Sequence, residues 1–392
     1  MKIFIALALL TAGCATEPQS WAELSKQLAG ADPAGRSALI QKYVGTHGGT
    51  PLIENQTRLI FLAQDVNGMA PRIVGDFNAW ASTPQGYDAT IGTMRRIEGT
   101  DWSFLEGTAY TNARLEYTLL YEAADGADKQ NARPDPLNLH LVQAYAGPRS
   151  EVRMPLWVEQ PEIDETAQVP AGELIAETYA SRALGGSRRV WFYLPPGYAA
   201  STDLYPVLYI LDGGNYIEKM DVPRVLDRLV ARKAIPAVIA VFSEPVDRME
   251  EYSRNPKWRA FISSELVPMV DKRFRTFPAP DHRAILGSSL AAYGAIDLSV
   301  EYPSLFGLCA AIAPPAQAAT LITNQVKAKA AVQSIRFFVL GGVYDAMING
   351  ARNLRTTLDN VNAPVTYLEV PEGHSTETFR AHLDDALSAL LK

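Results

Sequence analysis

The apolar residues of this chain follow two different patterns, one before residue 157 and one after residue 173. In the first part they form short runs separated by turn sequences such as Asn-Gly and Asp-Gly. These runs lie at 59–63, 70–77, 102–105 and 115–121. Short strands at this spacing are typical of a β-sandwich, which we expect over residues 49–156.

After residue 173 the apolar runs become continuous and alternate with stretches of helical spacing. The expected strands are 189–194, 207–211, 237–242, 284–286, 308–312, 335–340 and 365–370. The expected helices are 223–233, 258–273, 290–301, 350–360 and 376–391. Strands that are apolar throughout, with helices between them, predict a mostly parallel sheet covered on both faces. We therefore expect an α/β domain over 174–392, joined to the sandwich by a polar, proline-broken linker at 157–173.

The pattern of residues at the N-terminus is typical of an export signal. Met1-Lys2 precedes an apolar run over 3–10, and small residues lead to Cys14. This order is typical of a secretory signal and is too short to span a membrane as a mature helix. We expect a signal and tether over 1–19, either lipidated at Cys14 as in bacterial lipoproteins or cleaved near Ala15. Residues 20–48 have helical spacing with a break near Asp32, which predicts a spacer of two short helices.

The composition of the chain bears on which partners and cofactors it can bind. The 392 residues carry a net charge of −7, which argues against a nucleic-acid partner. Cys309 is the only cysteine besides Cys14, and its apolar surroundings in the sequence predict a core residue without a disulfide. The chain has five histidines and no metal-ligand spacing, so we expect neither a metal nor a cofactor.

The stretch from Gly287 to Ala291, Gly-Ser-Ser-Leu-Ala, lies where an apolar strand passes into a small-residue helix. A serine at the centre of such a turn stands clear of the sheet edge, and the residues two positions away must be small. Ser289 is the expected nucleophile, since the neighbouring Ser288 is not at the apex of the turn. Alternatively, Ser289 only caps the helix.

A serine hydroxyl needs a base within hydrogen-bond reach and an acid that orients the base. Asp345 directly follows the strand expected at 335–340, and His374 directly follows the strand expected at 365–370. We expect His374 to be the base and Asp345 the orienting acid. Alternatively, Asp345 caps the following helix, and Glu372 or Asp212 orients the histidine.

An oxyanion formed at this serine would need two backbone N–H donors. One is expected from Leu290, directly after the nucleophile. The other is expected from Gly214, with Gly213 as the next choice, because two glycines after the strand 207–211 allow the backbone to approach a substrate.

Side chains at neighbouring strand exits are candidates for substrate binding. Arg248 would bind an anionic or catecholate-like group, or else pair with Glu251 and hold its loop. Tyr216, Tyr252 and Tyr344 would form the walls of an aromatic acyl pocket, or else pack at its rim.

Taken together, these motifs resemble those of the esterase D, enterochelin esterase and feruloyl esterase group of α/β-hydrolases. The resemblance covers about 174–392 and rests on Leu-Asp-Gly-Gly-Asn-Tyr, Arg-Met-Glu-Glu-Tyr, Phe-Ile-Ser-Ser-Glu-Leu-Val-Pro, the serine turn and Gly-His. It implies a serine carboxyl-ester hydrolase that works through an acyl-enzyme. The chain departs from the group at Ala291 and Ala292, where Gly-Gly or Gly-Leu is usual.

The first part of the chain has a resemblance of its own. Gly-Asp-Phe-Asn-Ala-Trp at 75–80, followed by Asp-Pro-Leu-Asn at 135–138, resembles the immunoglobulin-like module of glycogen-branching enzymes and some esterases. In that group the module sometimes binds carbohydrate and sometimes only shapes the mouth of the active site. Trp80 and Trp102 would stack on a sugar or an aromatic ring, or else pack in the sandwich core.

The sequence leaves the substrate open. The resemblance implies a small-molecule or polysaccharide-linked ester, either a siderophore-type trilactone or a feruloyl or acetyl ester. An export signal would place the enzyme in the periplasm or anchor it to the outer membrane. Acyl transfer in place of hydrolysis is one alternative, and a non-catalytic, carbohydrate-binding surface lipoprotein is another.

Overall fold

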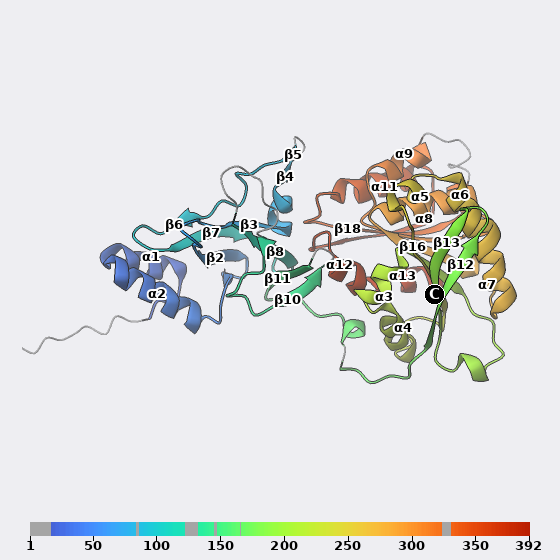
Figure 1. The fold of residues 1–392 in the computed structure, drawn as a ribbon, viewed down its shortest axis with the longest axis horizontal. Coiled ribbons are helices and arrows are strands. Elements are labelled where there is room, and N and C mark those ends of the chain that lie inside the picture. Colours follow the sequence, from blue (N-terminus) through green and yellow to red (C-terminus); the bar gives the residue numbers. More distant parts are fainter. Residues whose placement is uncertain (1–16, 84–85, 122–131, 145–146, 165, 324–330) are drawn as a thin grey trace, which may run out of the picture.

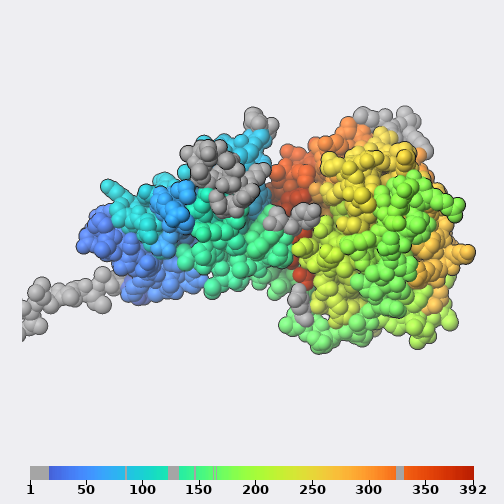
Figure 2. All heavy atoms as spheres, viewed as in Figure 1, coloured from blue at the N-terminus to red at the C-terminus, as the bar shows by residue number. Residues whose placement is uncertain are grey.

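The chain forms two domains that lie side by side along its longest axis (Figure 1). The computed structural model describes residues 17–83, 86–121, 132–144, 147–164, 166–323 and 331–392. The expected signal sequence and Cys14 lie outside the described residues. The space-filling view shows the two lobes in direct contact, with C-terminal residues meeting the first domain at the junction (Figure 2).

The N-terminal domain contains two antiparallel sheets. One has the order β1 (Leu52–Glu54), β2 (Arg58–Gln64), β7 (Trp102–Thr108) and β6 (Arg95–Arg96). The other has the order β10 (Leu141–Ala144), β11 (Gly147–Arg153), β8 (Arg114–Leu120) and β3 (Arg72–Gly75), with β9 (Ala132–Arg133) also on β8. Phe61 of the first sheet packs against Tyr117 of the second in a shared core, as in a sandwich. Its immunoglobulin-like character remains a prediction.

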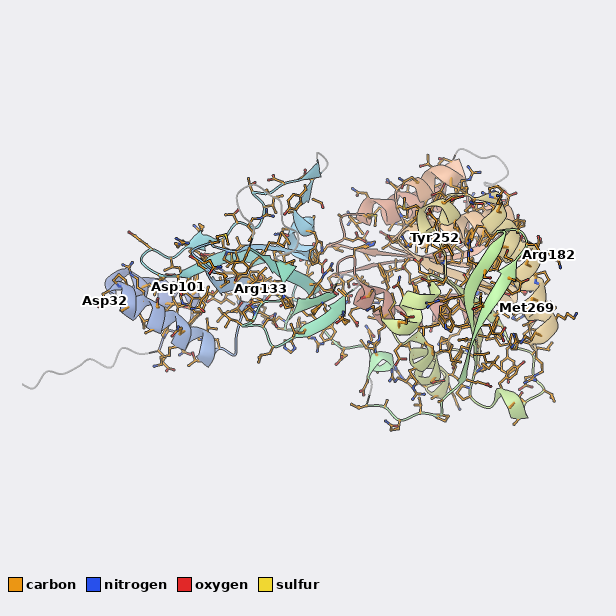
Figure 3. The ribbon with its side chains drawn as sticks, in the orientation of Figure 1. Asp32, Asp101, Arg133, Arg182, Tyr252 and Met269 are labelled. Atoms are coloured by element: carbon orange, nitrogen blue, oxygen red, sulfur yellow. The ribbon has the colours of Figure 1, made fainter. Side chains whose placement is uncertain are left out.

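Two helices cover the outer face of the first sheet. Both α1 (Trp21–Gly30) and α2 (Pro33–Thr46) pack on β2 and β7 through a second apolar core that includes Trp102. Because Trp102 is 2% exposed in this core, it is not available to stack on a sugar. The two helices therefore belong to the packed domain and do not form a free spacer. Asp32, at the turn between them, lies at the end remote from the second domain (Figure 3).

The second domain is built on an eight-stranded sheet. The strands β15, β14, β16, β17, β18 and β19, which follow one another in the sheet in that order, all run parallel, whereas β12 and β13 are joined antiparallel at one edge. The order is β12 (Glu173–Ser181), β13 (Gly186–Leu194), β15 (Ile239–Ser243), β14 (Val207–Leu211), β16 (Arg283–Ser288), β17 (Leu308–Ile312), β18 (Arg336–Gly342) and β19 (Val365–Val370). Every residue of β14, β15, β16 and β17 is buried, as expected of strands covered on both faces.

Helices pack on both faces of this sheet in two separate apolar cores. One face carries α5 (Arg248–Tyr252), α6 (Pro256–Ala260), α7 (Val267–Arg273), α8 (Leu290–Glu301), α9 (Gln317–Thr323) and α11 (Ile348–Asn360). The other carries α3 (Gly213–Glu218), α4 (Val222–Ala231), α12 (Thr376–Ala381) and α13 (Leu383–Leu391). The helix expected over 258–273 includes a π-helical turn at Phe261–Leu266, and the one expected over 376–391 is interrupted at His382.

Within the described residues, no helix is both long enough and apolar enough to cross a membrane.

Candidate active site

Ser289 lies on a strained turn between β16 and α8. Its backbone has φ 57° and ψ −127°, a conformation that costs free energy for any residue except glycine. Its amide donates to the carbonyl oxygen of Ile312 in the neighbouring strand at 2.9 Å. Ser288 is the last residue of β16 and has extended strand geometry. The turn therefore projects Ser289, and not Ser288, from the end of the strand.

The close approach of strand and helix at this turn requires the glycine at position 287. A Cβ atom there would lie 2.2 Å from the carbonyl oxygen of Ala291. Ala291 itself is completely buried, and its methyl group is accommodated in the core beneath α8. The replacement of the usual glycine by Ala291 thus leaves the turn intact.

His374 and Asp345 come together from the loops after β19 and β18. Nδ1 of His374 lies 2.7 Å from Oδ2 of Asp345, and Oδ1 of Asp345 accepts the amide of Met347 at 2.7 Å. Asp345 is 4% exposed, so both of its oxygens are held in a dry environment. The ring of Phe379 meets the imidazole edge-on, with 5.2 Å between ring centroids. The imidazole is therefore fixed at one nitrogen and packed on one side.

The two alternative orienting acids are engaged elsewhere. Glu372 accepts a hydrogen bond from Arg114 at 2.9 Å, and Asp212 accepts from Nε of Arg248 at 2.8 Å. Among the three acids, only Asp345 has a hydrogen bond with His374 in the described structure.

Ser289 and His374 line the same cavity, which has a volume of about 350 Å³. Asp212, Tyr216 and Arg248 contribute from the catalytic domain. The N-terminal domain also contributes to the wall, through Ala144 of β10 and Arg149 of β11. The cavity is thus a site shared by the two domains.

Gly213 and Gly214 are the first two residues of α3, and the sequence did not indicate the acceptor of the Gly214 amide. The Gly214 amide donates to Oε2 of Glu244 at 2.6 Å, so this N–H already has an acceptor. Burial raises the pKa of the Glu244 carboxyl. Gly213 is packed against Phe242, where a Cβ atom would lie 2.8 Å from the Phe242 Cβ. No acceptor for the amides of Gly213 and Leu290 is found among the described residues.

The three tyrosines expected to line the pocket have different positions. Tyr216 lines the cavity, and burial raises the pKa of its hydroxyl. Tyr252 is 1% exposed and lies inside the catalytic domain (Figure 3), and its hydroxyl accepts the amide of Asp212 at 2.9 Å. Tyr344 faces the N-terminal domain, because its hydroxyl accepts the amide of Tyr110 at 2.9 Å. Neither Tyr252 nor Tyr344 is part of the cavity wall.

The alternative pairing of Arg248 with Glu251 is not found among the described residues. Arg248 pairs with Asp212 and also donates to the carbonyl oxygen of Ser288 at 3.3 Å, while Glu251 pairs with Arg188 at 2.7 Å. Arg248 therefore borders the cavity and links Asp212, directly before α3, to the strand end that carries the serine turn.

Residues of the two motifs at 75–80 and 135–138 form hydrogen bonds within the N-terminal domain. The indole N–H of Trp80 donates to Asp76 at 2.9 Å, and the guanidinium of Arg149 lies over the indole at 4.1 Å from its centroid. Asp135, from the second motif, accepts the hydroxyl of Tyr117 at 2.9 Å. Trp80 is partly exposed and lines a separate hollow of the N-terminal domain, which has Arg149 in common with the catalytic cavity, whereas Asp135 is buried inside the sandwich.

Arg149 and Phe379 are two of the site residues that the sequence did not reveal. Arg149 reaches the cavity from a strand of the other domain, and Phe379 reaches it from the first turns of α12. Neither lies in a motif with chemical meaning, so only the tertiary structure brings them to the site. Within the described ranges, no group of three or more His, Cys, Asp or Glu side chains has the arrangement of a metal site.

The fold and the serine turn together define an α/β-hydrolase type of protein. Residues 181–390 match the family model described as putative esterase, which covers more than half of the chain. The protein therefore belongs to this esterase family.

Individual relatives agree with this assignment. The iron(III) enterobactin esterase of Escherichia coli strain K12 is 26% identical over 271 residues, which cover 64% of this chain and 66% of that enzyme. The structure of the enterobactin esterase FES from Shigella flexneri has a TM-score of 0.72 at 21% identity, covering 89% of this chain and 97% of that chain. A ferulic acid esterase structure has a TM-score of 0.53 at 21% identity, covering 57% of this chain and 99% of that chain.

The matched segments are shorter than the relatives themselves. They span 54% and 66% of the length of two curated relatives.

Proposed function

We propose that this protein hydrolyses a carboxylic ester through a serine acyl-enzyme. The observation that carries the proposal is the hydrogen bond between His374 and Asp345 at the wall of the cavity that also exposes Ser289. With Nδ1–H donated to Asp345, Nε2 of His374 is left as the base. Ser289 Oγ attacks the ester carbonyl, Nε2 takes its proton, and the same proton then leaves with the alcohol. Water, activated by His374, releases the acid.

The negative charge that develops on the carbonyl oxygen needs donors that have no other acceptor. We assign these roles to the amides of Leu290 and Gly213. Gly213 takes the place expected for Gly214, because the Gly214 amide is bound to Glu244.

Within the ester class, we propose a large, siderophore-type trilactone as the substrate. Two observations support it: the two-domain fold is shared with the Shigella enterobactin esterase, and the cavity wall includes the N-terminal domain. A feruloyl ester is the second candidate, supported by the likeness of the catalytic domain to a ferulic acid esterase. Acyl transfer and a non-catalytic, glycan-binding role are less well supported, because the site has a base, an acid and a serine in order.

Covalent labelling tests the mechanism directly. A fluorophosphonate probe should label the wild-type protein and should not label Ser289→Ala. Ser288→Ala is the matched control and should label at the wild-type rate. Absence of labelling in the wild type would refute the serine mechanism. Rates with p-nitrophenyl acetate, methyl ferulate and iron(III) enterobactin would then rank the substrates, and a preference for methyl ferulate would overturn the trilactone assignment.

We also propose export and lipid attachment at Cys14, on the basis of the signal-like N-terminus. Palmitate labelling of cells that express the full chain should mark the wild type and not Cys14→Ser. Labelling of neither, with the protein in the cytosolic fraction, would contradict this proposal.

A further inference from the structure

We propose that Arg114, in the N-terminal domain, is a positioning residue for His374. The inference rests on the proposed role of His374 as the base. It assigns the N-terminal domain a part in forming the active site itself, beyond a contribution to the cavity wall.

Arg114 donates hydrogen bonds to residues on both sides of His374 in the segment 371–375, here called the histidine loop. Its Nη2 donates to Glu372 at 2.9 Å, two residues before the histidine, and to Ser375 at 3.4 Å, one residue after it. The same nitrogen lies 3.2 Å from Oγ1 of Thr378 in α12, to which it also donates. A single guanidinium therefore binds the segments that enter and leave His374.

The backbone of Arg114 reinforces this contact. Its amide donates to the carbonyl oxygen of Pro371 at 3.3 Å, which forms an isolated parallel bridge between β8 and the histidine loop. Arg114 is 4% exposed, and its Nη1 donates to Glu151 at 3.0 Å within its own domain. A charge that is buried and paired to acids on two domains fixes their relative position, because separation would leave it without a partner.

A second, independent contact lies between Asp76 and Gly373. A Cβ atom on Gly373 would fall 2.0 Å from Cγ of Asp76, so the residue before His374 rests directly on this side chain. Asp76 is itself fixed, because its oxygens accept the amide of Glu116 at 2.7 Å and the indole N–H of Trp80 at 2.9 Å. The aspartate of the Gly-Asp-Phe-Asn-Ala-Trp motif thus provides the surface on which the histidine loop lies.

Arg114 and Asp76 contact the histidine loop from the N-terminal domain, whereas Asp345 contacts His374 from within the catalytic domain. Asp345 sets the orientation of the imidazole through Nδ1, whereas Arg114 and Asp76 hold the backbone that carries it. In Figure 1, α12 lies at the junction of the domains beside β10, with which it is in contact. A base that is misplaced by about 1 Å can lose about 100-fold in rate.

The test compares Arg114→Lys and Arg114→Met with Arg153→Lys. Arg153 pairs with Glu151, as Arg114 does, but it has no hydrogen bond with the histidine loop among the described contacts. The readouts are the rate of fluorophosphonate labelling, and kcat and KM for p-nitrophenyl acetate, a small ester whose turnover reports on His374 and not on substrate contacts with the N-terminal wall. Urea unfolding of each variant reports the folded fraction.

We expect Arg114→Met to lower the labelling rate and kcat at least tenfold, with KM within twofold of wild type. Arg114→Lys should fall between, because an ammonium keeps the charge but cannot bind both acids as a fork does. Arg153→Lys should keep the wild-type rate. Labelling within twofold of wild type in folded Arg114→Met, or an equal loss in Arg153→Lys, would overturn the inference. Loss of labelling in the wild type would instead refute the proposed function.

A second pair of variants keeps the test decisive if Arg114→Met does not fold. Gly373→Ala should slow labelling, because its methyl group would collide with Asp76. Combining it with Asp76→Gly removes the colliding atoms and should recover part of the lost rate. A folded Gly373→Ala that labels at the wild-type rate would overturn the inference, because displacement of the histidine loop would then have no effect on His374.

Discussion

Asp345 holds His374 with one carboxylate oxygen at 2.7 Å and binds the amide of Met347 with the other at the same distance. Both interactions require a carboxylate that accepts at each oxygen. The acid is thus oriented by the backbone of the loop before it orients the imidazole. This arrangement supports the proposed role of Asp345 over that of Glu372, although Glu372 is closer to His374 in sequence.

Replacement of Asp345 by asparagine should therefore impair the chemical step without changing the fold. The asparagine amide group would face either the imidazole or the Met347 amide, and would favour the wrong tautomer of His374. We expect kcat to fall by about 10³–10⁴-fold with little change in KM. Steady-state kinetics on p-nitrophenyl acetate would measure this, with Asp359→Asn on the surface of α11 as the control. A loss smaller than tenfold would show that Asp345 does not orient the base.

The turn that carries Ser289 makes a contrasting prediction for its two small residues. Gly287→Ala would place a methyl group 2.2 Å from a backbone oxygen, and we expect it to lower the free energy of unfolding by about 1–3 kcal/mol and to abolish most activity. Ala291→Gly restores the residue usual in this group and should keep activity, at a cost of about 0.5–1 kcal/mol for a glycine in a helix. Urea unfolding and ester hydrolysis of both variants would test this; equal effects of the two would contradict the close-approach argument.

The catalytic domain was predictable because its elements are fixed by local sequence. Strands β14, β17 and β19 and helix α8 have the bounds that the apolar pattern predicts, and Ser289, Asp345 and His374 each follow a strand in that order. In a parallel sheet, strand ends at one edge lie together, so residues far apart in sequence could be assigned to one site.

Other features depend on tertiary partners that no local pattern reveals. Strand β12 is mostly exposed at the edge of the sheet, so it lacks the continuous apolar run of its neighbours. His382, between α12 and α13, and Arg114 each form a buried ion pair with Glu372. Likewise, the acceptor of the Gly214 amide is a glutamate from another loop, and no pattern near Gly214 in the sequence indicates this contact.

His382 gives the protein a pH-dependent stability at alkaline pH. Burial would lower the pKa of this imidazole, but hydrogen bonds to Asp385 and Glu372 outweigh burial and raise it to about 9. Because the folded-state pKa is above the ordinary value of about 6.5, the stabilisation is complete below pH 6.5 and is lost as the pH rises through 9.

The corresponding experiment compares urea unfolding at pH 6 and pH 9.5. We expect the wild type to lose on the order of 3 kcal/mol more than His382→Gln over this range. His47→Gln, at an exposed position in the N-terminal domain, is the control and should follow the wild type. An identical pH dependence in wild type and His382→Gln would show that this histidine is not charged in the folded protein.

Arg149 should distinguish large substrates from small ones. Its guanidinium lies over Trp80 at 4.1 Å, pairs with Glu116 at 3.0 Å and borders the catalytic cavity from the N-terminal domain. A small ester held at Ser289 does not need this wall, whereas a trilactone large enough to fill the cavity would contact it. Arg149→Lys keeps the charge that Glu116 requires but loses the flat surface that stacks on the indole.

We therefore expect Arg149→Lys to raise KM for iron(III) enterobactin by about three- to tenfold, while kcat/KM for p-nitrophenyl acetate stays within twofold. Arg133→Lys is the matched control, because Arg133 lies over Tyr121 at 4.0 Å in the same domain but does not border the cavity (Figure 3). Equal effects of Arg149→Lys on both substrates would mean that Arg149 maintains the structure of the site and does not contact the large ester. An unchanged KM for the large ester would place the trilactone away from the N-terminal wall and would favour a smaller substrate.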